Sequence, residues 1–113
     1  MAQIEISPAQ GVWTVRTADG VLVESRRALE LREDGHGPVI YFPREDVAMA
    51  LLERSATTTR CPRKGVASYY HYVGANDRVD DVAWTYEAPD RDAARPIAGY
   101  LAFYGDKVTV EEL

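Results

Sequence analysis

Residues 13–24 read WTVRTADGVLVE. Apolar and polar side chains alternate on both sides of the pair Asp19-Gly20, which is the period of a half-buried strand. A glycine in such a pair takes the positive φ that a tight hairpin turn requires. The segment therefore predicts two antiparallel strands joined by a two-residue turn.

The same alternation returns along most of the chain, with strands expected near 29–32, 39–42, 67–73, 82–87, 100–104 and 107–110. A second two-residue turn, Gly105-Asp106, predicts a hairpin between the last two. The segment 56–65 is expected to be irregular. About eight short, evenly spaced strands favour an antiparallel fold, since parallel units need helices between their strands.

After Pro43 the spacing of the apolar residues changes from that of a strand to that of a helix. Val47, Ala50 and Leu51 recur at i, i+3 and i+4, which predicts an amphipathic helix over about 44–54 with Glu45 and Asp46 in its first turn. The fold class expected for residues 1–113 is thus a single, mainly β domain. It is a small antiparallel strand-rich domain, with twisted sheets or a partly open barrel and one short α-helix near 44–54.

The amino-acid composition of the chain argues against several classes of function. The chain has 113 residues and a formal net charge of −5, which argues against bulk nucleic-acid binding because phosphate contacts need a basic face. One cysteine allows neither an internal disulfide nor a zinc site built on several thiolates. No apolar run is long enough to cross a bilayer, and no secretory signal is visible at the start. A cytoplasmic protein without a membrane association is expected.

A short basic segment is the first candidate site, reading RCPRKG over residues 60–65. Arg60, Arg63 and Lys64 surround Cys61, and neighbouring cations stabilise the thiolate form of a cysteine. The segment therefore suggests a nucleophilic Cys61, or an anion held by Lys64 with Arg63 or Arg60. The alternative is that Cys61 only packs at the edge of the core, as many cysteines do.

The aromatic residues are the second candidate. All seven tyrosines lie after position 40, and several fall on neighbouring strands. Because strand side chains alternate, about half should face the core while the others line a surface cleft. Cross-strand pairs that only stabilise the sheet are the other reading. The residues concerned are Tyr69, Tyr70, Tyr72, Trp84, Tyr86, Tyr100 and Tyr104.

The sequence contains no clear pattern for binding a metal ion or a cofactor. His36 and His71 lack a third ligand that the sequence would nominate, and Asp90 and Asp92 read as a solvated loop. Neither a phosphate-binding G-x-x-x-x-G-K-[ST] loop nor a G-x-G-x-x-G turn is present. No metal and no cofactor is expected.

Four blocks follow one another along the chain: YFPREDV (41–47), TRCPRKGVASYY (59–70), AWTYEAP (83–89) and IAGYLAFY (97–104). Together they resemble the domain-of-unknown-function family 427, small bacterial and fungal proteins, over about residues 20–110. The resemblance implies a small strand-rich domain, and its blocks supply Asp46, Cys61, Lys64, Gly65, Tyr70, Trp84 and Tyr86. Arg63 departs from the aromatic residue more usual there.

The family sometimes carries a nucleotidyltransferase-like label. This chain lacks the Gly-Ser turn and paired strand carboxylates with which such enzymes hold two metals, so that activity is not expected.

Two hypotheses remain. In the first, the domain binds a small anionic or ring-containing ligand through the Lys64/Cys61 loop and an aromatic face, and whether it is also an enzyme stays open. The residues it assigns to the ligand are Lys64, Arg63, Arg60, Tyr70, Trp84, Tyr86 and Asp46, with Cys61 as the catalytic candidate. In the second, the Tyr/Trp-rich face is a protein-interaction surface, for instance of a homodimer.

Overall fold

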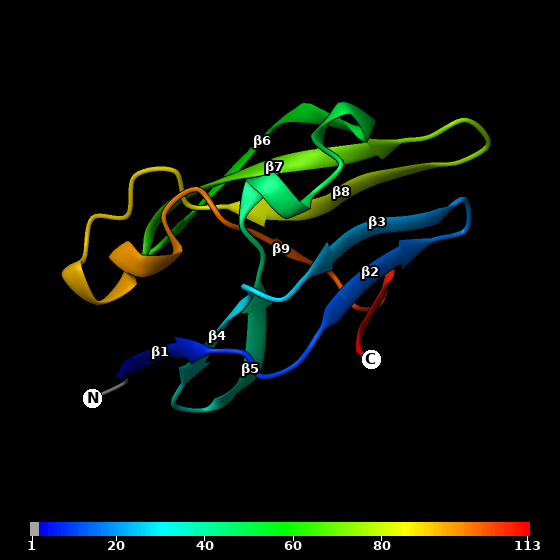
Figure 1. Ribbon diagram of the computed structural model, residues 1–113. Helices are drawn as coiled ribbons and strands as arrows, with labels where there is room; N and C mark the ends of the chain where they lie inside the picture. Colours follow the sequence, from blue (N-terminus) through cyan, green and yellow to red (C-terminus); the bar gives the residue numbers. More distant parts are fainter. Residues whose placement is uncertain (1–2) are drawn as a thin grey trace.

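The hairpin expected around Asp19-Gly20 is present in the computed structural model, which describes residues 3–113 (Figure 1). β2 (Trp13–Thr17) pairs antiparallel with β3 (Gly20–Ser25). The register shifts after Val15, so the strict alternation is lost: Leu22 and Val23 are both buried, whereas Val21 is 57% exposed. A bulge of this kind turns successive side chains to the same face.

The strands form three antiparallel sheets, which confirms the mainly β prediction. The first sheet has the order β1-β4-β5, with β1 (Ile4–Pro8), β4 (Leu29–Glu33) and β5 (His36–Tyr41). The second has the order β10-β2-β3, where β10 is Thr109–Glu112. The third has the order β6-β7-β8-β9, with β6 (Leu52–Cys61), β7 (Gly65–Val73), β8 (Arg78–Thr85) and β9 (Leu101–Phe103).

The helix predicted over 44–54 is not formed as such. The segment makes two short 3-10 turns, η1 (Arg44–Asp46) and η2 (Met49–Leu51), and β6 already begins at Leu52. Its backbone bonds go elsewhere: Val47 bridges to Val23, and the Ala48 N–H donates to Leu22 O at 3.0 Å. Pairing with β3 thus overrides the helical period.

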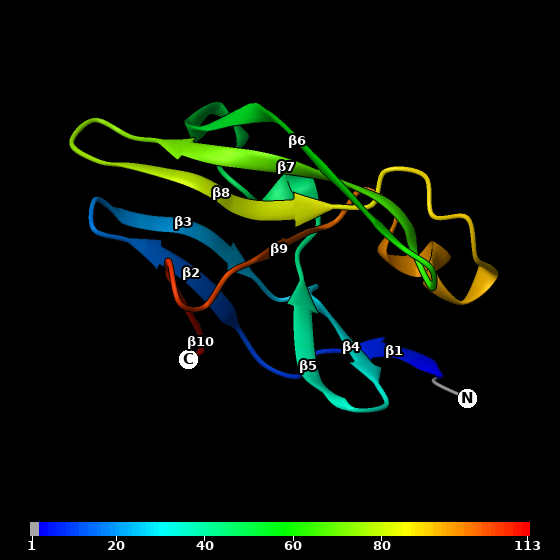
Figure 2. The ribbon, with the colours of Figure 1, turned by 180° about the vertical axis from the view of Figure 1, so that it is seen from behind.

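Two further expectations from the sequence are wrong. The segment 56–65, expected to be irregular, continues β6 up to Cys61 and then makes a tight turn, because its run of threonines suits an extended strand. Gly105-Asp106 does not join a hairpin: β9 pairs with β8, whereas β10 pairs with β2. That turn instead carries the chain from the third sheet to the second (Figure 2).

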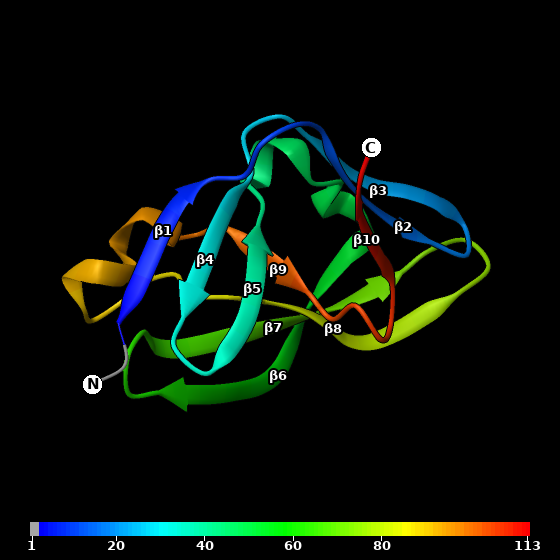
Figure 3. The same ribbon diagram turned by 90° about the horizontal axis from the view of Figure 1, so that it is seen from below.

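The third sheet packs against both others, and this divides the buried residues into two clusters. One, around Val15, Val23 and Tyr72, lies between the second and third sheets. The other, around Leu31, Tyr41 and Tyr69, lies between the first and third sheets. β5 and β9 run close together where the sheets meet, at the bridge between Phe42 and Leu101 (Figure 3).

The one longer 3-10 segment is η3 (Asp92–Ile97), which closes the second cluster with the fully buried Ile97. Within residues 3–113, helices are all too short or too polar to span a membrane.

Candidate functional site

A cavity of about 310 Å³, called here the first cavity, opens between the first and third sheets beside the second cluster. Strands far apart in sequence contribute to it, from β4 to the residue after β9. Its aromatic lining residues are Tyr41, Tyr69, Trp84, Tyr86 and Tyr104. Its polar lining residues are Glu33, His36, Cys61, Arg63 and Lys64. The sequence's two candidate features, the basic segment and the aromatic set, therefore meet in one cavity.

Strand pairing places the aromatic walls. Tyr69 on β7 is the direct partner of Trp84 on β8, so both side chains project from the same face of the third sheet. Tyr41, from β5, meets the Trp84 ring edge-on at 6.4 Å between centroids and accepts a 3.2 Å hydrogen bond from its Nε1. Tyr104 packs on the other side of Trp84, at 4.6 Å between ring centroids. Trp84 is thus fixed by neighbours and keeps part of its surface in the cavity.

The hydroxyls of Tyr41, Tyr86 and Tyr104 in the first cavity stay protonated at neutral pH. Burial is the main cause that raises the pKa of Tyr41 and of Tyr86, and the negative groups near them act in the same direction. Burial, with the neighbouring Tyr69, raises the pKa of Tyr104 to about 12. Tyr41 Oη accepts its bond from Trp84, so its own proton is available for donation. The walls present neutral hydrogen-bond donors.

Lys64 closes the turn between β6 and β7 and points inward. Its side chain is only 9% exposed. The ammonium nitrogen lies 3.0 Å from Glu33 Oε1, 3.6 Å from Cys61 Sγ and 5.8 Å from the centroid of the Tyr86 ring. Glu33 and Cys61 take two of the three donors of the ammonium group, and the Tyr86 ring lies within cation–π distance. Lys64 therefore holds Glu33 and the thiol in place, and most of its bonding capacity is used inside the protein.

Arg63 differs from Lys64, because it lies at the rim. Its Nε pairs with the second carboxylate oxygen of Glu33, and its side chain is 40% exposed. Among residues 3–113, the two terminal nitrogens of Arg63 have no hydrogen-bond partner in the structure. With a neutral thiol, Lys64 and Arg63 carry two positive charges against one on Glu33, so the cluster has one net positive charge. Its exposed part is the guanidinium fork of Arg63.

The turn itself depends on glycine. Gly65 has a φ of +116°, and the Lys64 N–H donates to Cys61 O at 3.2 Å. A Cβ at Gly65 would also lie 3.2 Å from the backbone nitrogen of Asp90, which in turn donates to Lys64 O. The backbone therefore fixes where Cys61, Arg63 and Lys64 point.

Five of the residues chosen from the sequence line the first cavity, namely Cys61, Arg63, Lys64, Trp84 and Tyr86. Arg60 lies outside its lining and pairs at the surface with Asp90, at 3.1 Å. Tyr70 is one residue from Tyr69, so it projects to the opposite face of the sheet. There it packs between Arg44 and Arg54, each 5.7 Å from its ring centroid.

Asp46 also lies away from the first cavity. Its carboxylate accepts hydrogen bonds from Arg27 at 2.9 Å and from Ser25 Oγ at 2.7 Å. These two bonds lower the pKa of Asp46, which keeps it ionised at neutral pH. The group ties η1 to the end of β3, a contact that stabilises the fold.

Sequence reasoning missed two lining residues, Glu33 and Tyr41. Tyr69 and Tyr104 also line the cavity; the sequence placed them in the aromatic set but did not assign them to the ligand. One signal was available for Glu33, since a buried lysine requires a carboxylate partner. Nothing local in the sequence could select Glu33, because it lies 31 positions before Lys64.

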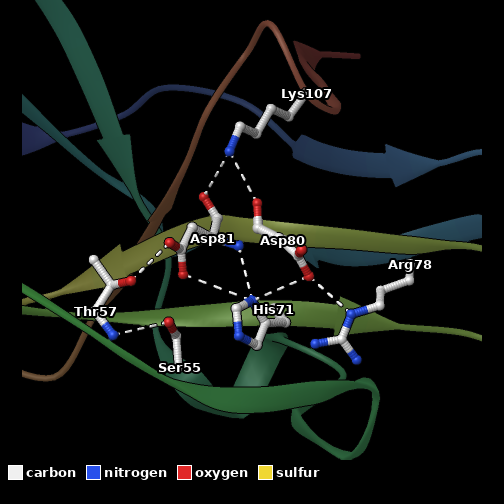
Figure 4. A network of polar contacts seen from close by, with 7 residues as sticks. All are labelled: Ser55, Thr57, His71, Arg78, Asp80, Asp81 and Lys107. Carbon is white, nitrogen blue, oxygen red and sulfur yellow. Dashed lines mark hydrogen bonds and ion pairs between the residues drawn. The ribbon is translucent and has the colours of Figure 1, made fainter.

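A second polar network surrounds His71, on β7, at the point where β8 bulges (Figure 4). The Asp81 N–H donates to His71 Nδ1 at 3.0 Å. The Asp80 and Asp81 carboxylates lie 3.5 and 3.6 Å from the same nitrogen. Lys107 donates to the carbonyl oxygens of both aspartates, at 2.9 and 3.3 Å (Figure 4).

Asp81 has a positive φ of 47°, which is uncommon outside glycine. Hydrogen bonding with Ser55, and then with Thr57 at 2.9 Å, lowers the pKa of its carboxyl group. The network thus fixes the bulge between β7 and β8. Across residues 3–113, no group of three or more His, Cys, Asp or Glu side chains is arranged to hold a metal ion.

The model of a family described as a domain of unknown function, DUF427, matches residues 5–113. None of the curated proteins compared with the chain matches it.

Proposed function

Because the chain belongs to the DUF427 family, whose description names no activity, we propose from its first cavity that the domain binds a small molecule with an aromatic ring and one acidic group. The observation that carries this proposal is a single cavity in which five aromatic side chains adjoin a cluster of net charge +1. Apolar walls with a few convergent polar groups are typical of ligand sites.

Arg63 is assigned to the acidic group. Lys64 is buried and bonded to Glu33 and Cys61, whereas the side chain of Arg63 is 40% exposed. A guanidinium fork matches a carboxylate or phosphate with two parallel hydrogen bonds. The ring of the ligand then lies against Trp84 and the tyrosines, which supply apolar area and hydroxyl donors.

The first test is a fluorescence titration of Trp84 with benzoate, in a Trp13→Phe background that leaves Trp84 as the only tryptophan. We expect a saturable change with a roughly millimolar Kd, since nine atoms at about 0.5 kcal/mol each give about 4.5 kcal/mol. Neutral benzamide should bind at least several-fold more weakly, because it lacks the charge that pairs with Arg63.

Arg63→Met should remove the preference for benzoate over benzamide. Arg32→Met is the matched control, since Arg32 is exposed on β4 and lies outside the lining of the first cavity. No saturable change with benzoate up to tens of millimolar would contradict the proposal, and so would an equal loss in both variants.

Cys61 is the group of the site that could act on a bound ligand. It is partly exposed, it lines the first cavity, and Lys64 donates toward its sulfur. A nearby ammonium stabilises the thiolate, which is the nucleophilic form. We therefore expect iodoacetamide to alkylate Cys61 in the folded protein, and benzoate to slow the reaction by occupying the cavity.

Two variants distinguish activation of the Cys61 thiol by Lys64 from simple exposure of the thiol to the reagent. Lys64→Met combined with Glu33→Gln, which removes both charges of the buried pair, should slow alkylation at pH 7 by several-fold. Arg60→Met should change it little, because Arg60 directs its charge to Asp90. Alkylation rates by mass spectrometry measure both effects. A thiol that reacts only after unfolding would make Cys61 a wall residue and leave binding as the whole function.

The interaction surface is the weaker candidate. Most of the aromatic residues that would form it are buried inside the domain, namely Tyr69, Tyr70, Tyr72 and Tyr86. Buried rings cannot supply the exposed aromatic core that a protein interface needs. Their burial supports a concave ligand site over a flat interface.

A further inference from the structure

A second cavity of about 350 Å³ borders the first one. The two share Val39, Trp84 and Tyr104 in their linings. All three residues are half-buried, so each keeps part of its surface accessible to solvent. A ligand that lies over the exposed part of Trp84 would touch the lining of both cavities.

The second cavity differs in chemistry from the first. Apart from the shared residues, its lining is mostly apolar, with Trp13, Pro38, Ile40, Phe103 and Val110. Trp13 donates its Nε1–H to Gln10 O at 3.0 Å, so the indole has no unpaired polar group to offer. The charged lining residue is Glu30, which is neutralised by Arg32 at 2.5 Å. This cavity suits an uncharged apolar group.

We propose that the two cavities bind one elongated ligand, an aryl or acyl carboxylate whose acidic end pairs with Arg63 and whose apolar end lies against Trp13. This rests on the proposed function, because it places the acidic group in the first cavity. Charge complementarity sets the orientation of the ligand. The cluster with a net positive charge lines the first cavity, whereas the second cavity has no unpaired charge among the described residues. Trp84 and Tyr104, whose rings contact each other at 47° and line both cavities, support the middle of the ligand.

The test compares benzoate with biphenyl-4-carboxylate, which adds a second ring on the axis of the first. Isothermal titration calorimetry of the unaltered chain, which keeps Trp13, should show biphenyl-4-carboxylate binding at least tenfold more tightly. Pro38 is exposed and lines the second cavity but not the first. Pro38→Trp should therefore abolish the gain in affinity from the second ring and leave benzoate binding unchanged. Pro38→Ala is the control that should keep the gain.

The outcomes separate the two proposals. The elongated-ligand proposal would be overturned if benzoate binds but the second ring adds no affinity, or if the added affinity survives Pro38→Trp. Either result would leave the proposed function standing. If neither compound binds, the proposed function itself fails. A concentration-dependent dimer by light scattering that Pro38→Trp dissociates would assign the second cavity to another copy of the chain and overturn the proposal.

Discussion

Glu33→Gln is expected to lower the free energy of unfolding by about 3–5 kcal/mol, because it leaves the Lys64 ammonium buried without its countercharge. The side chains of both partners are more than nine-tenths buried, at 9% and 7% exposed, so water cannot replace the lost carboxylate. Urea unfolding measures the difference. Glu30→Gln is the matched control on the same strand, where the pair with Arg32 lies at the surface and should contribute no more than about 1 kcal/mol.

A double variant tests the cause of that loss. Glu33→Gln with Lys64→Met removes both charges and should recover part of the stability, because breaking a buried pair costs more than removing it. If Glu33→Gln costs no more than Glu30→Gln, then Lys64 is solvated in the folded protein. The assignment of its donors to Glu33 and Cys61 would then be wrong.

The sequence predicted the strands well where one face is buried and the other polar. The hairpin at Asp19-Gly20 is the best example, because its signal is contained in twelve residues. Alternation also separates Tyr69, which lines the first cavity, from Tyr70, which points the other way. Applied strictly, it would have excluded Tyr70 from the site.

Elements that depend on distant partners were not predictable in this way. The segment 44–54 has helical spacing, yet the bridge between Val47 and Val23 draws it toward β3. Gly105-Asp106 has hairpin chemistry, yet the strand after it pairs with β2, almost a whole chain length away in sequence. In both cases tertiary pairing overrides a correct local signal.

The sequence predicted the basic residues of the candidate site but not the carboxylate that pairs with them. The sequence gives a cluster of basic residues around Cys61, because they are neighbours along the chain. It does not show that Glu33 neutralises part of that charge, since only the pairing of the folded strands brings the carboxylate to Lys64. The proposed function therefore assigns the acidic group of the ligand to Arg63 and not to Lys64.

Gly74→Ala is expected to destabilise the protein by about 2–4 kcal/mol, because there is no space for a methyl group at this position. A Cβ there would lie 2.1 Å from Tyr72 Oη and 2.3 Å from Asp19 Oδ2. These two atoms form a 2.8 Å hydrogen bond, which joins the tip of the β7–β8 hairpin to the tip of the β2–β3 hairpin. Tyr72 is buried and cannot turn away, so the methyl group should break the bond and part the hairpin tips.

Gly37→Ala supplies the control, since an added Cβ there meets no atom within 4 Å and the backbone has no positive φ. We expect its effect on the free energy of unfolding to stay within about 0.5 kcal/mol. Tyr72→Phe measures the hydrogen bond alone, and should cost about 1–2 kcal/mol, less than Gly74→Ala. If Gly74→Ala is as mild as Gly37→Ala, Asp19 and Tyr72 can move apart without cost. The contact between the two hairpin tips would then contribute nothing to holding the second sheet against the third.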